Sequence, residues 1–250
     1  MDLSLYTGLK DRDLRREGLL VAEGGLLAAR LLASGWPVLG VVCSPRFADR
    51  FAALSRGLCP LQVLSDERMA AVAGYGFHRG VLAVGRRPPF PSLEQVLGAV
   101  GERSTLAVCP ELTNAENLGS VIRSAAAFGL DGVLLGPRCC DPLSRKALKV
   151  SMGAAFVLPL VPLDEEAHAC GDLHAAGFTV AVTSLCADAL PLEGFLRGPR
   201  LCLVFGNEAM GVGEPWRSCC DLELTVPMQA GSDSLNAAVS AGIFFYALRG

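Results

Sequence analysis

Three stretches in the C-terminal half of the chain constrain the fold most strongly. Each joins a short apolar run to a small polar loop rich in glycine, asparagine or serine. The stretches are Ala107–Arg123, Leu201–Gly213 and Leu222–Leu248. Short β-type runs followed by helical patterns predict a parallel α/β sheet. Ligands of such sheets bind beyond the carboxyl ends of the strands, so we expect the three loops to meet at one site.

The same alternation of strand and helix patterns extends over the C-terminal part of the chain. The predicted strands are Leu106–Leu112, Gly132–Leu135, Phe156–Val161, Thr179–Val182, Leu201–Phe205 and Leu222–Val226. The predicted helices are Leu118–Phe128, Ser144–Ala154, Glu165–Ala176 and Ser234–Leu248. This order predicts a larger α/β domain over residues 103–250.

A smaller α/β domain is predicted before it, over residues 1–90. Its predicted elements are a helix at Glu17–Ser34, a strand at Val38–Cys43, a helix at Ser65–Ala73 and a strand at Gly80–Val84. Three prolines then interrupt the pattern within Arg86–Ser92. We therefore predict a proline-containing linker, and place it at residues 91–102.

Composition excludes several classes of protein. Hydrophobic residues make up 51% of the chain and charged residues 19%, which suits a buried core and argues against disorder. No apolar stretch reaches the 18 or so residues that a membrane span needs. The charged N-terminal segment lacks the apolar core of a signal peptide, so we expect a cytoplasmic protein with no membrane partner.

The cysteines and histidines do not form a metal-binding pattern. The chain has ten cysteines but no C-x-x-C, and its three histidines stand at no zinc-finger spacing from them. We interpret most of these thiols as small buried hydrophobes, and we expect no metal site.

The charge distribution gives only weak support for nucleic-acid binding. The formal net charge is −3. Residues 1–100 carry 12 basic and 9 acidic side chains, whereas residues 101–250 carry 10 and 16. A basic run at Arg138–Lys149 is interpreted as a solvated helix face.

The three polar loops resemble, in the same order, three sequence motifs of a known family. Asn114–Arg123 resembles the first motif of the SpoU (TrmH-like) RNA ribose 2′-O-methyltransferases, which belong to the SPOUT superfamily. Gly206–Gly211 resembles the second, although Ala209 stands where the family often has glycine. Pro227–Met228 followed by Ser234–Asn236 resembles the third. The match covers about residues 103–250.

The resemblance implies a fold, a reaction and partners. It implies a deep C-terminal trefoil knot, an exception to the unknotted rule. It also implies an L30e-like substrate-binding domain at residues 1–90, where Glu23-Gly24 and His78–Val84 match. The implied reaction is S-adenosylmethionine-dependent methylation of a ribose 2′-hydroxyl in structured RNA, with ribosomal RNA favoured over transfer RNA. The implied assembly is a homodimer formed through the C-terminal domain.

Arg123 is the only charged side chain in Leu118–Leu130. A guanidinium among apolar neighbours must pair, face a cleft or extend to water along the helix surface, because bare burial is costly. The resemblance implies that Arg123 is the catalytic arginine, to which the family usually assigns the role of general base. Because arginine stays protonated in proteins, a bidentate phosphate contact is the physically easier role.

The other catalytic positions that the resemblance implies are Asn117, Glu208, Ser234 and Asn236. Three of the four have a structural alternative. Asn117 and Ser234 could cap helices, and Glu208 could be a solvated loop carboxylate. The resemblance favours a role for Asn117 and Glu208 in orienting Arg123 or the ribose.

The cofactor-binding positions that the resemblance implies are Gly206, Val226, Met228 and Leu235. These residues offer backbone groups and apolar walls for an adenine. A different class remains open, a non-catalytic RNA-binding or assembly protein that retains the knotted fold. An unrelated nucleotide-binding protein would leave the order of the three motifs unexplained.

Overall fold

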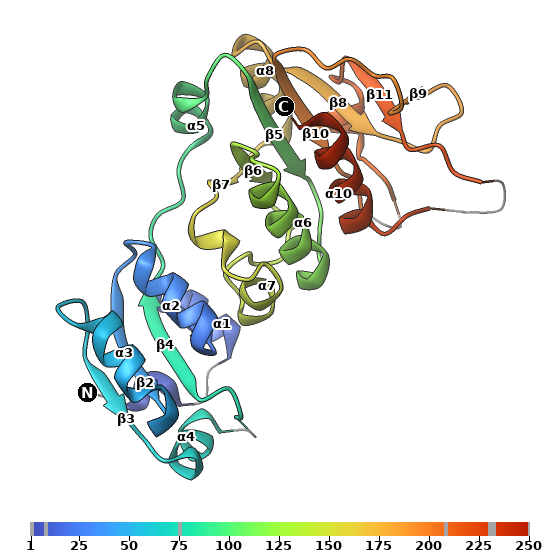
Figure 1. The fold of residues 1–250 in the computed structure, drawn as a ribbon. Coiled ribbons are helices and arrows are strands. Elements are labelled where there is room, and N and C mark those ends of the chain that lie inside the picture. The colour runs from blue at the N-terminus through green and yellow to red at the C-terminus, as the bar shows by residue number, and fades with distance from the viewer. Residues whose placement is uncertain (1–2, 8–9, 75–76, 208–209, 230–233, 250) are drawn as a thin grey trace. The chain divides into compact units, whose positions relative to one another are not determined.

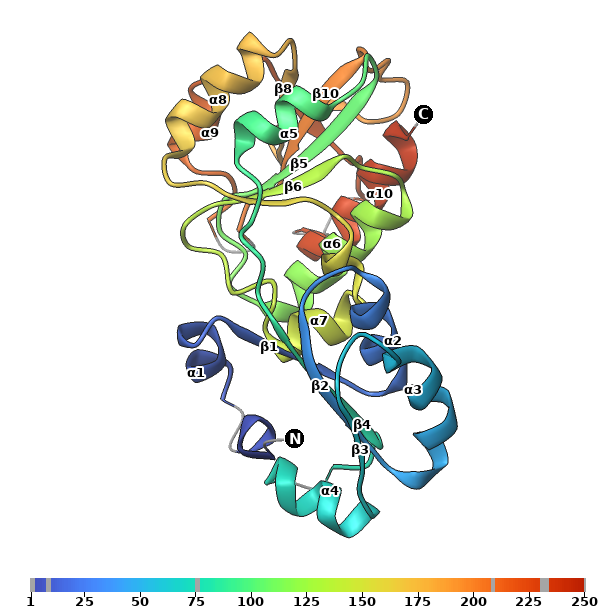
Figure 2. The same cartoon turned by 90° about the vertical axis from the view of Figure 1, so that its left-hand side faces the viewer.

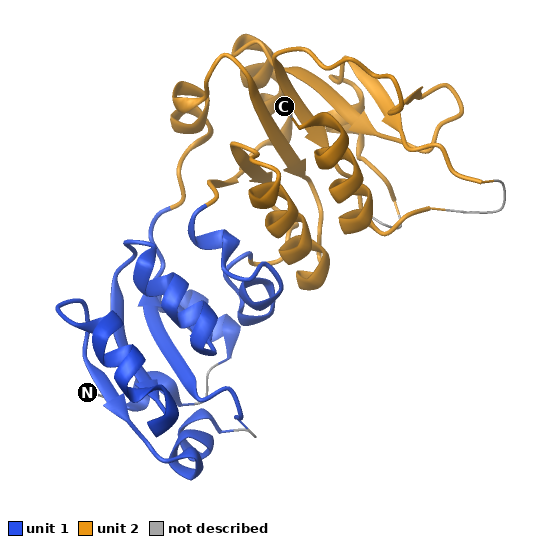
Figure 3. Cartoon of the chain, in the orientation of Figure 1, with its two compact units in different colours: residues 1–89, 142–157 blue, residues 90–141, 158–250 orange. Residues whose placement is uncertain are grey.

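The structure is a computed structural model of the chain, and it describes residues 3–7, 10–74, 77–207, 210–229 and 234–249. Two compact units make up the chain (Figure 3). Unit 1 contains residues 1–89 and 142–157, and unit 2 contains residues 90–141 and 158–250. Among the described residues, no helix is both long and apolar enough to cross a membrane.

Unit 1 is built on a four-stranded mixed sheet. Its strands, in spatial order, are β1 (Leu19–Glu23), β4 (Val81–Arg86), β2 (Val38–Cys43) and β3 (Leu61–Val63). β4 runs antiparallel to β1 and β2, and β2 runs parallel to β3. The carboxyl ends of β1 and β2 therefore share one edge with the start of β4.

Helices from several parts of the chain belong to unit 1. They are α1 (Asp11–Arg16), α2 (Gly25–Ala33), α3 (Ala48–Ser55), α4 (Asp66–Ala73) and α7 (Arg145–Val150), with 3₁₀ turns at Leu3–Tyr6, Pro45–Phe47 and Ala154–Phe156. The helix predicted at Ser65–Ala73 is confirmed, and the Ser65 hydroxyl caps it by accepting from the Arg68 amide at 3.3 Å. A serine oxygen at this position satisfies an otherwise unpaired helical N–H.

The single helix predicted at Glu17–Ser34 is wrong. Its first part is strand β1, which pairs with β4 and is almost wholly buried. Gly24 then adopts φ 93°, a conformation that favours glycine, and α2 starts at the next residue. The leucines fit a helical period, but the strand pairing and the glycine break override that local signal.

The segment at residues 142–157 packs with unit 1 rather than within the larger predicted domain. Arg145 forms ion pairs with Asp11 at 3.3 Å and with Glu23 at 3.1 Å. Phe156 makes an edge-to-face contact with Trp36, with ring centroids 5.3 Å apart. The predicted domains are continuous stretches of the chain, with boundaries at residues 90 and 103. The 142–157 segment belongs to unit 1 through contacts with residues far away in the sequence.

Unit 2 contains a seven-stranded sheet in which every strand pair is parallel. The strands, in spatial order, are β7 (Leu160–Pro162), β6 (Gly132–Leu135), β5 (Ser104–Cys109), β10 (Arg200–Val204), β8 (Thr179–Thr183), β11 (Leu222–Thr225) and β9 (Leu190–Pro191). This architecture confirms the predicted parallel α/β sheet.

Helices cover both faces of this sheet, as Figures 1 and 2 show. One face carries α5 (Leu93–Ala99), α8 (Glu166–Ala175) and α9 (Glu214–Arg217), and the other carries α6 (Ala115–Ala127) and α10 (Ala237–Leu248). Trp216 is fully buried on the first face, and Phe205 packs edge-to-face against Phe244 and Phe245 on the second. Helix α5 occupies much of the predicted linker at 91–102, where Ser92 and Gln95 form a capping box.

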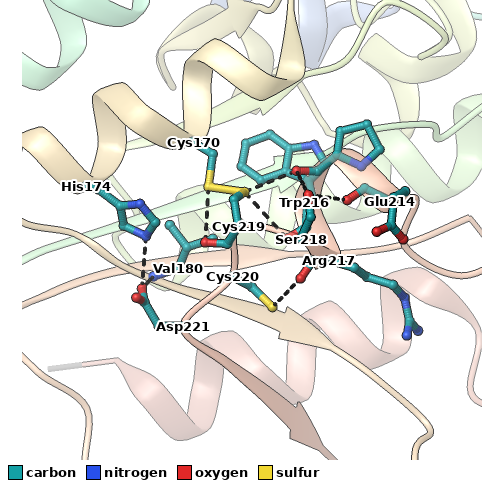
Figure 4. Close-up of a disulfide and its surroundings, with 11 residues drawn as sticks. Cys170, His174, Val180, Glu214, Trp216, Arg217, Ser218, Cys219, Cys220 and Asp221 are labelled. Carbon is teal, nitrogen blue, oxygen red and sulfur yellow. Dashed lines mark hydrogen bonds and ion pairs between the residues drawn. A yellow bond between two sulfur atoms is a disulfide. The ribbon is translucent and has the colours of Figure 1, made fainter.

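Cys170 and Cys219 form a disulfide between α8 and the residues that follow α9 (Figure 4). Most of the thiols are predicted to be small buried hydrophobes, and this pair departs from that prediction. Cys109 and Cys202 fit it, because both are fully buried free thiols. The pairing depends on two segments 49 residues apart in the chain, which local spacing does not reveal.

Candidate active site

A cavity of about 200 Å³ lies in unit 2, beyond the carboxyl ends of β8 and β10 and beside the start of α10. Its lining residues are Thr183, Ser184, Leu185, Phe205, Gly206, Asn207, Gly211, Val226, Met228, Ser234, Leu235, Ala237, Ser240 and Phe244. The second and third motifs therefore meet at one site, as parallel strands require of loops that leave the same edge of a sheet.

Close backbone packing shapes the side of the cavity that follows β10. A side chain at Gly206 would overlap the carbonyl carbon of Gly211, so only glycine fits there. Gly211 has φ +68°, a conformation that also favours glycine. These two glycines let the loop turn back on itself tightly while both line the cavity.

The first motif is connected to the third by a pair of amides. The Asn236 Nδ2 donates to the Asn117 Oδ1 at 3.0 Å. The Asn236 Oδ1 also accepts from the Ala238 and Val239 amides at 2.9 and 3.3 Å, so Asn236 is the N-cap of α10. The helix predicted to start at Ser234 starts at Ala237, and Ser234 lines the cavity instead of capping.

Helix α6 presents Arg123 on its exposed side. Its buried residues are Leu118, Gly119, Val121, Ile122 and Ala125. Arg123 is exposed and is not among the residues that line the cavity. The α6 cap is Asn114, whose Oδ1 accepts from the Glu116 amide at 2.8 Å, so Asn117 is not the cap of this helix.

The predicted site residues thus fall into separate groups. Five line the cavity, namely Gly206, Val226, Met228, Ser234 and Leu235. Asn117 and Asn236 form the amide pair, and Arg123 lies exposed on α6. Glu208 lies outside the described residues.

Several residues that line the cavity are not among the predicted site residues. Thr183 is the last residue of β8, Ser184 and Leu185 follow it, and Ser240 and Phe244 lie within α10. The Thr183 hydroxyl donates to the Val204 carbonyl at 3.0 Å, and Ser184 is buried. The sequence predicts a strand at Thr179–Val182. Because ligands of parallel sheets bind beyond the carboxyl ends of the strands, the residues that follow this strand are also expected at the site.

Burial controls the titration of the thiols beyond β5 and β6. Burial raises the pKa of Cys139 to about 11 and that of Cys140 to about 11. The Cys139 thiol donates to the Cys109 carbonyl at 2.9 Å and accepts from the Leu112 amide at 3.3 Å. These thiols are protonated at neutral pH and act as packing groups rather than nucleophiles. The described residues include no group of three or more side chains that could hold a metal ion.

Comparison with known proteins adds to this geometry. Residues 104–246 match the SpoU rRNA Methylase family. A Mycobacterium tuberculosis protein named as an uncharacterized tRNA/rRNA methyltransferase is 35% identical over 237 residues, which span 92% of this chain and 80% of that protein. The 23S rRNA (guanosine-2′-O-)-methyltransferase RlmB of Acinetobacter baylyi is 30% identical over 190 residues, spanning 74% of this chain and 76% of that protein.

A solved structure shares the fold. The crystal structure of the SpoU methyltransferase AviRb from Streptomyces viridochromogenes, in complex with the cofactor AdoMet, superposes with a TM-score of 0.81. The similarity covers 98% of this chain and 94% of that chain, at 22% identity. It therefore extends over both units of the chain described above.

Proposed function

The chain belongs to the SpoU rRNA Methylase family, and we propose that it transfers a methyl group from S-adenosylmethionine to a ribose 2′-hydroxyl of structured RNA. Ribosomal RNA is favoured over transfer RNA, since RlmB, with 30% identity, is a 23S rRNA 2′-O-methyltransferase. The observation that carries the proposal is the cavity of about 200 Å³, in which the second and third motifs meet. The Asn117–Asn236 hydrogen bond ties the first motif to the same place.

The cavity suits an adenosyl group. Phe205, Val226, Met228 and Phe244 supply apolar walls for a flat ring, and Ser184 adds a buried polar residue to the lining. Gly206, Val226, Met228 and Leu235 are the residues that we propose hold the cofactor. When bound, S-adenosylmethionine supplies a methyl group activated by a positively charged sulfur.

Arg123 has the chemistry of a phosphate clamp. Arg123 is exposed on α6, and its guanidinium can bind a phosphate through two parallel N–H bonds. Such a contact would fix the neighbouring ribose without requiring arginine to lose a proton. We propose that Arg123 orients the reacting hydroxyl, and that Asn117, Glu208, Ser234 and Asn236 assist it. Holding two reactants in place supplies much of the acceleration of a transfer reaction.

Unit 1 is proposed to dock the RNA. At the edge where β2 ends, the Arg46 guanidinium lies 4.9 Å from the centre of the Phe47 ring and donates to the His78 carbonyl at 3.0 Å. Arg79 approaches the Gly24 turn from the neighbouring loop. Exposed arginines beside an aromatic ring can bind phosphates and stack on unpaired bases.

The docking proposal is tested with charge-reversal variants. We expect Arg46→Glu or Arg79→Glu to weaken RNA binding about tenfold and to flatten its salt dependence, because fewer counterions are released. Cofactor affinity should not change. Arg56→Glu, an exposed arginine after the end of α3, is the matched control and should bind RNA like the wild type. Equal losses in all three variants would contradict a specific docking edge.

We also propose the knot and the dimer that the family resemblance implies. Strand β10 lies between β5 and β8, although β8 and β9 precede it in the chain. This return of the chain to the middle of the sheet supports a threaded C-terminal region. A dimer through unit 2 is supported by Val239, Ile243 and Tyr246, which are 53%, 37% and 59% exposed on α10.

The alternative is a non-catalytic RNA-binding protein that retains the same fold. Calorimetry with S-adenosylmethionine separates the two possibilities, since the enzyme should bind the cofactor and the alternative has no need to. If the protein does not bind S-adenosylmethionine at millimolar concentration, the proposed function is wrong. Mapping ribose 2′-O-methylation in a deletion strain, before and after the gene is returned, then identifies the RNA and the nucleotide.

A further inference from the structure

Asn207 forms hydrogen bonds that close the loop after β10 and attach it to the neighbouring strand. Its main-chain N–H donates to the Gly211 carbonyl at 2.9 Å, and its carbonyl accepts from the Gly211 amide at 2.9 Å. Its side-chain Oδ1 accepts from the Met210 amide at 3.3 Å. Its side-chain Nδ2 donates to the Glu111 carbonyl at 3.2 Å.

The last of these bonds joins two strand ends. Glu111 follows β5, and β5 and β10 are parallel neighbours, so the Asn207 amide spans the gap between their carboxyl ends. The Glu111 carboxylate is used separately, since its Oε2 accepts from the Arg138 Nε at 2.8 Å. The main-chain and side-chain oxygens of Glu111 can therefore be tested independently.

The loop that Asn207 closes is a wall of the cavity. Gly206, Asn207 and Gly211 all line it. Because Gly206 has no room for a side chain against Gly211, a small change in the approach of these two backbones would move the cavity wall. The side chain of Asn207 connects this wall to the residues that follow β5, through its bond to the Glu111 carbonyl.

We propose that Asn207 is a positioning residue, which holds Gly206 and Gly211 in the arrangement that lines the cofactor cavity. This inference rests on the proposed function. The inference concerns the side-chain hydrogen bonds to the Met210 amide and, across the sheet edge, to the Glu111 carbonyl. Loss of both should weaken cofactor binding more than it lowers turnover at saturating cofactor.

Two substitutions separate the bonds. Asn207→Ala removes both, whereas Asn207→Asp keeps an acceptor for the Met210 amide and removes the donor to the Glu111 carbonyl. We expect Asn207→Ala to weaken S-adenosylmethionine binding at least about tenfold, and Asn207→Asp to weaken it to a lesser degree, since each hydrogen bond contributes only modestly. The turnover number at saturating cofactor should change less than about threefold.

Arg138→Ala is the matched control, because it breaks the side-chain pair of Glu111 and leaves the Glu111 carbonyl in place. It should bind the cofactor like the wild type. Wild-type affinity in Asn207→Ala would overturn the inference. So would a fall in turnover and melting temperature with unchanged affinity, because that result indicates a merely structural role.

A cofactor-free measurement distinguishes failure of this inference from failure of the proposed function. Hydrogen exchange of the Met210 and Gly211 amides should be at least about tenfold faster in Asn207→Ala than in the wild type, and unchanged in Arg138→Ala. If the wild type fails to bind S-adenosylmethionine, the proposed function falls, and the exchange rates still report on the loop. Unchanged exchange in Asn207→Ala would overturn the positioning role by itself.

Discussion

The Asn236 side chain donates to the Asn117 Oδ1 at 3.0 Å and so joins two motifs that are 119 residues apart in the chain. Asn236 also caps α10, so one residue has a structural and a positioning contact at once. Asn236→Ala should cost about 1 kcal/mol of folding stability through the lost cap and should also lower methyl transfer. Asn236→Ser keeps a capping oxygen but has no amide to donate. We expect it to melt near the wild-type temperature with reduced activity, and full activity in Asn236→Ser would contradict the positioning contact.

Arg123→Ala should reduce methyl transfer to less than a tenth of the wild-type rate, a loss of at least about 1.4 kcal/mol of transition-state stabilisation. The fold and cofactor binding should persist, since Arg123 is exposed and does not line the cavity. Arg123→Lys should be nearly as poor, because an ammonium group cannot form a bidentate contact. Single-turnover rates check this, and more than a tenth of wild-type activity in the alanine variant would show that the catalytic assignment is wrong.

Gly206→Ala should abolish cofactor binding at micromolar concentrations. The added methyl group would overlap the Gly211 carbonyl carbon, which is backbone and cannot rotate away. Gly213→Ala is the matched control, because its methyl group would meet only the Pro215 Cδ at 3.6 Å, an ordinary contact. Calorimetry on both variants tests the prediction, and equal affinity in the two would mean that the loop tolerates the displacement.

Sedimentation of the wild type at micromolar concentration should give twice the 26.2 kDa of one chain. Ile243→Lys places a charge in the middle of the exposed apolar stripe on α10 and should yield monomers, because burying an unpaired charge in an interface is costly. Leu196→Lys, at a position 91% exposed elsewhere in unit 2, is the control and should remain dimeric. A wild-type monomer with full activity would refute the dimer.

Reduction of the Cys170–Cys219 disulfide should lower the melting temperature. The disulfide links residues 49 apart, and opening it gives the unfolded chain more conformational entropy. The resulting loss of folding free energy is at most about 4 kcal/mol. Thermal unfolding with and without dithiothreitol measures the effect. Cys219→Ala should melt at the same temperature with and without reductant, and Cys186→Ser, an exposed free cysteine, should retain the response. A wild type that melts identically in both buffers would contradict the stabilising role.

The smaller domain has to be tested by point variants within the intact chain rather than by truncation. Removing residues 1–89 would leave the 142–157 segment without the strand and side chains that it packs against. Arg145 would lose both Asp11 and Glu23, and Phe156 would lose Trp36. A truncated protein could therefore fail for reasons unrelated to RNA.

Local pattern determined much of both units from the sequence alone. The bounds predicted for the strands at Val38–Cys43, in unit 1, and Gly132–Leu135, in unit 2, match the structure, because a short apolar run between turn residues favours a buried strand. The parallel sheet followed from the alternation of strands and helices. The polar loops could be placed at one edge of the sheet because parallel strands all end on the same side.

Contacts between distant segments decided the rest. Leu19–Glu23 satisfies a helical period but is a strand, because it pairs with β4, where Arg86 is the partner of Leu19 and Leu82 that of Glu23. Residues 142–157 belong to unit 1 through partners that local spacing does not reveal, and the Asn207–Glu111 bond depends on two strands becoming neighbours. Periodicity encodes which face of an element is apolar, whereas the choice of what covers that face is made only when the whole chain packs.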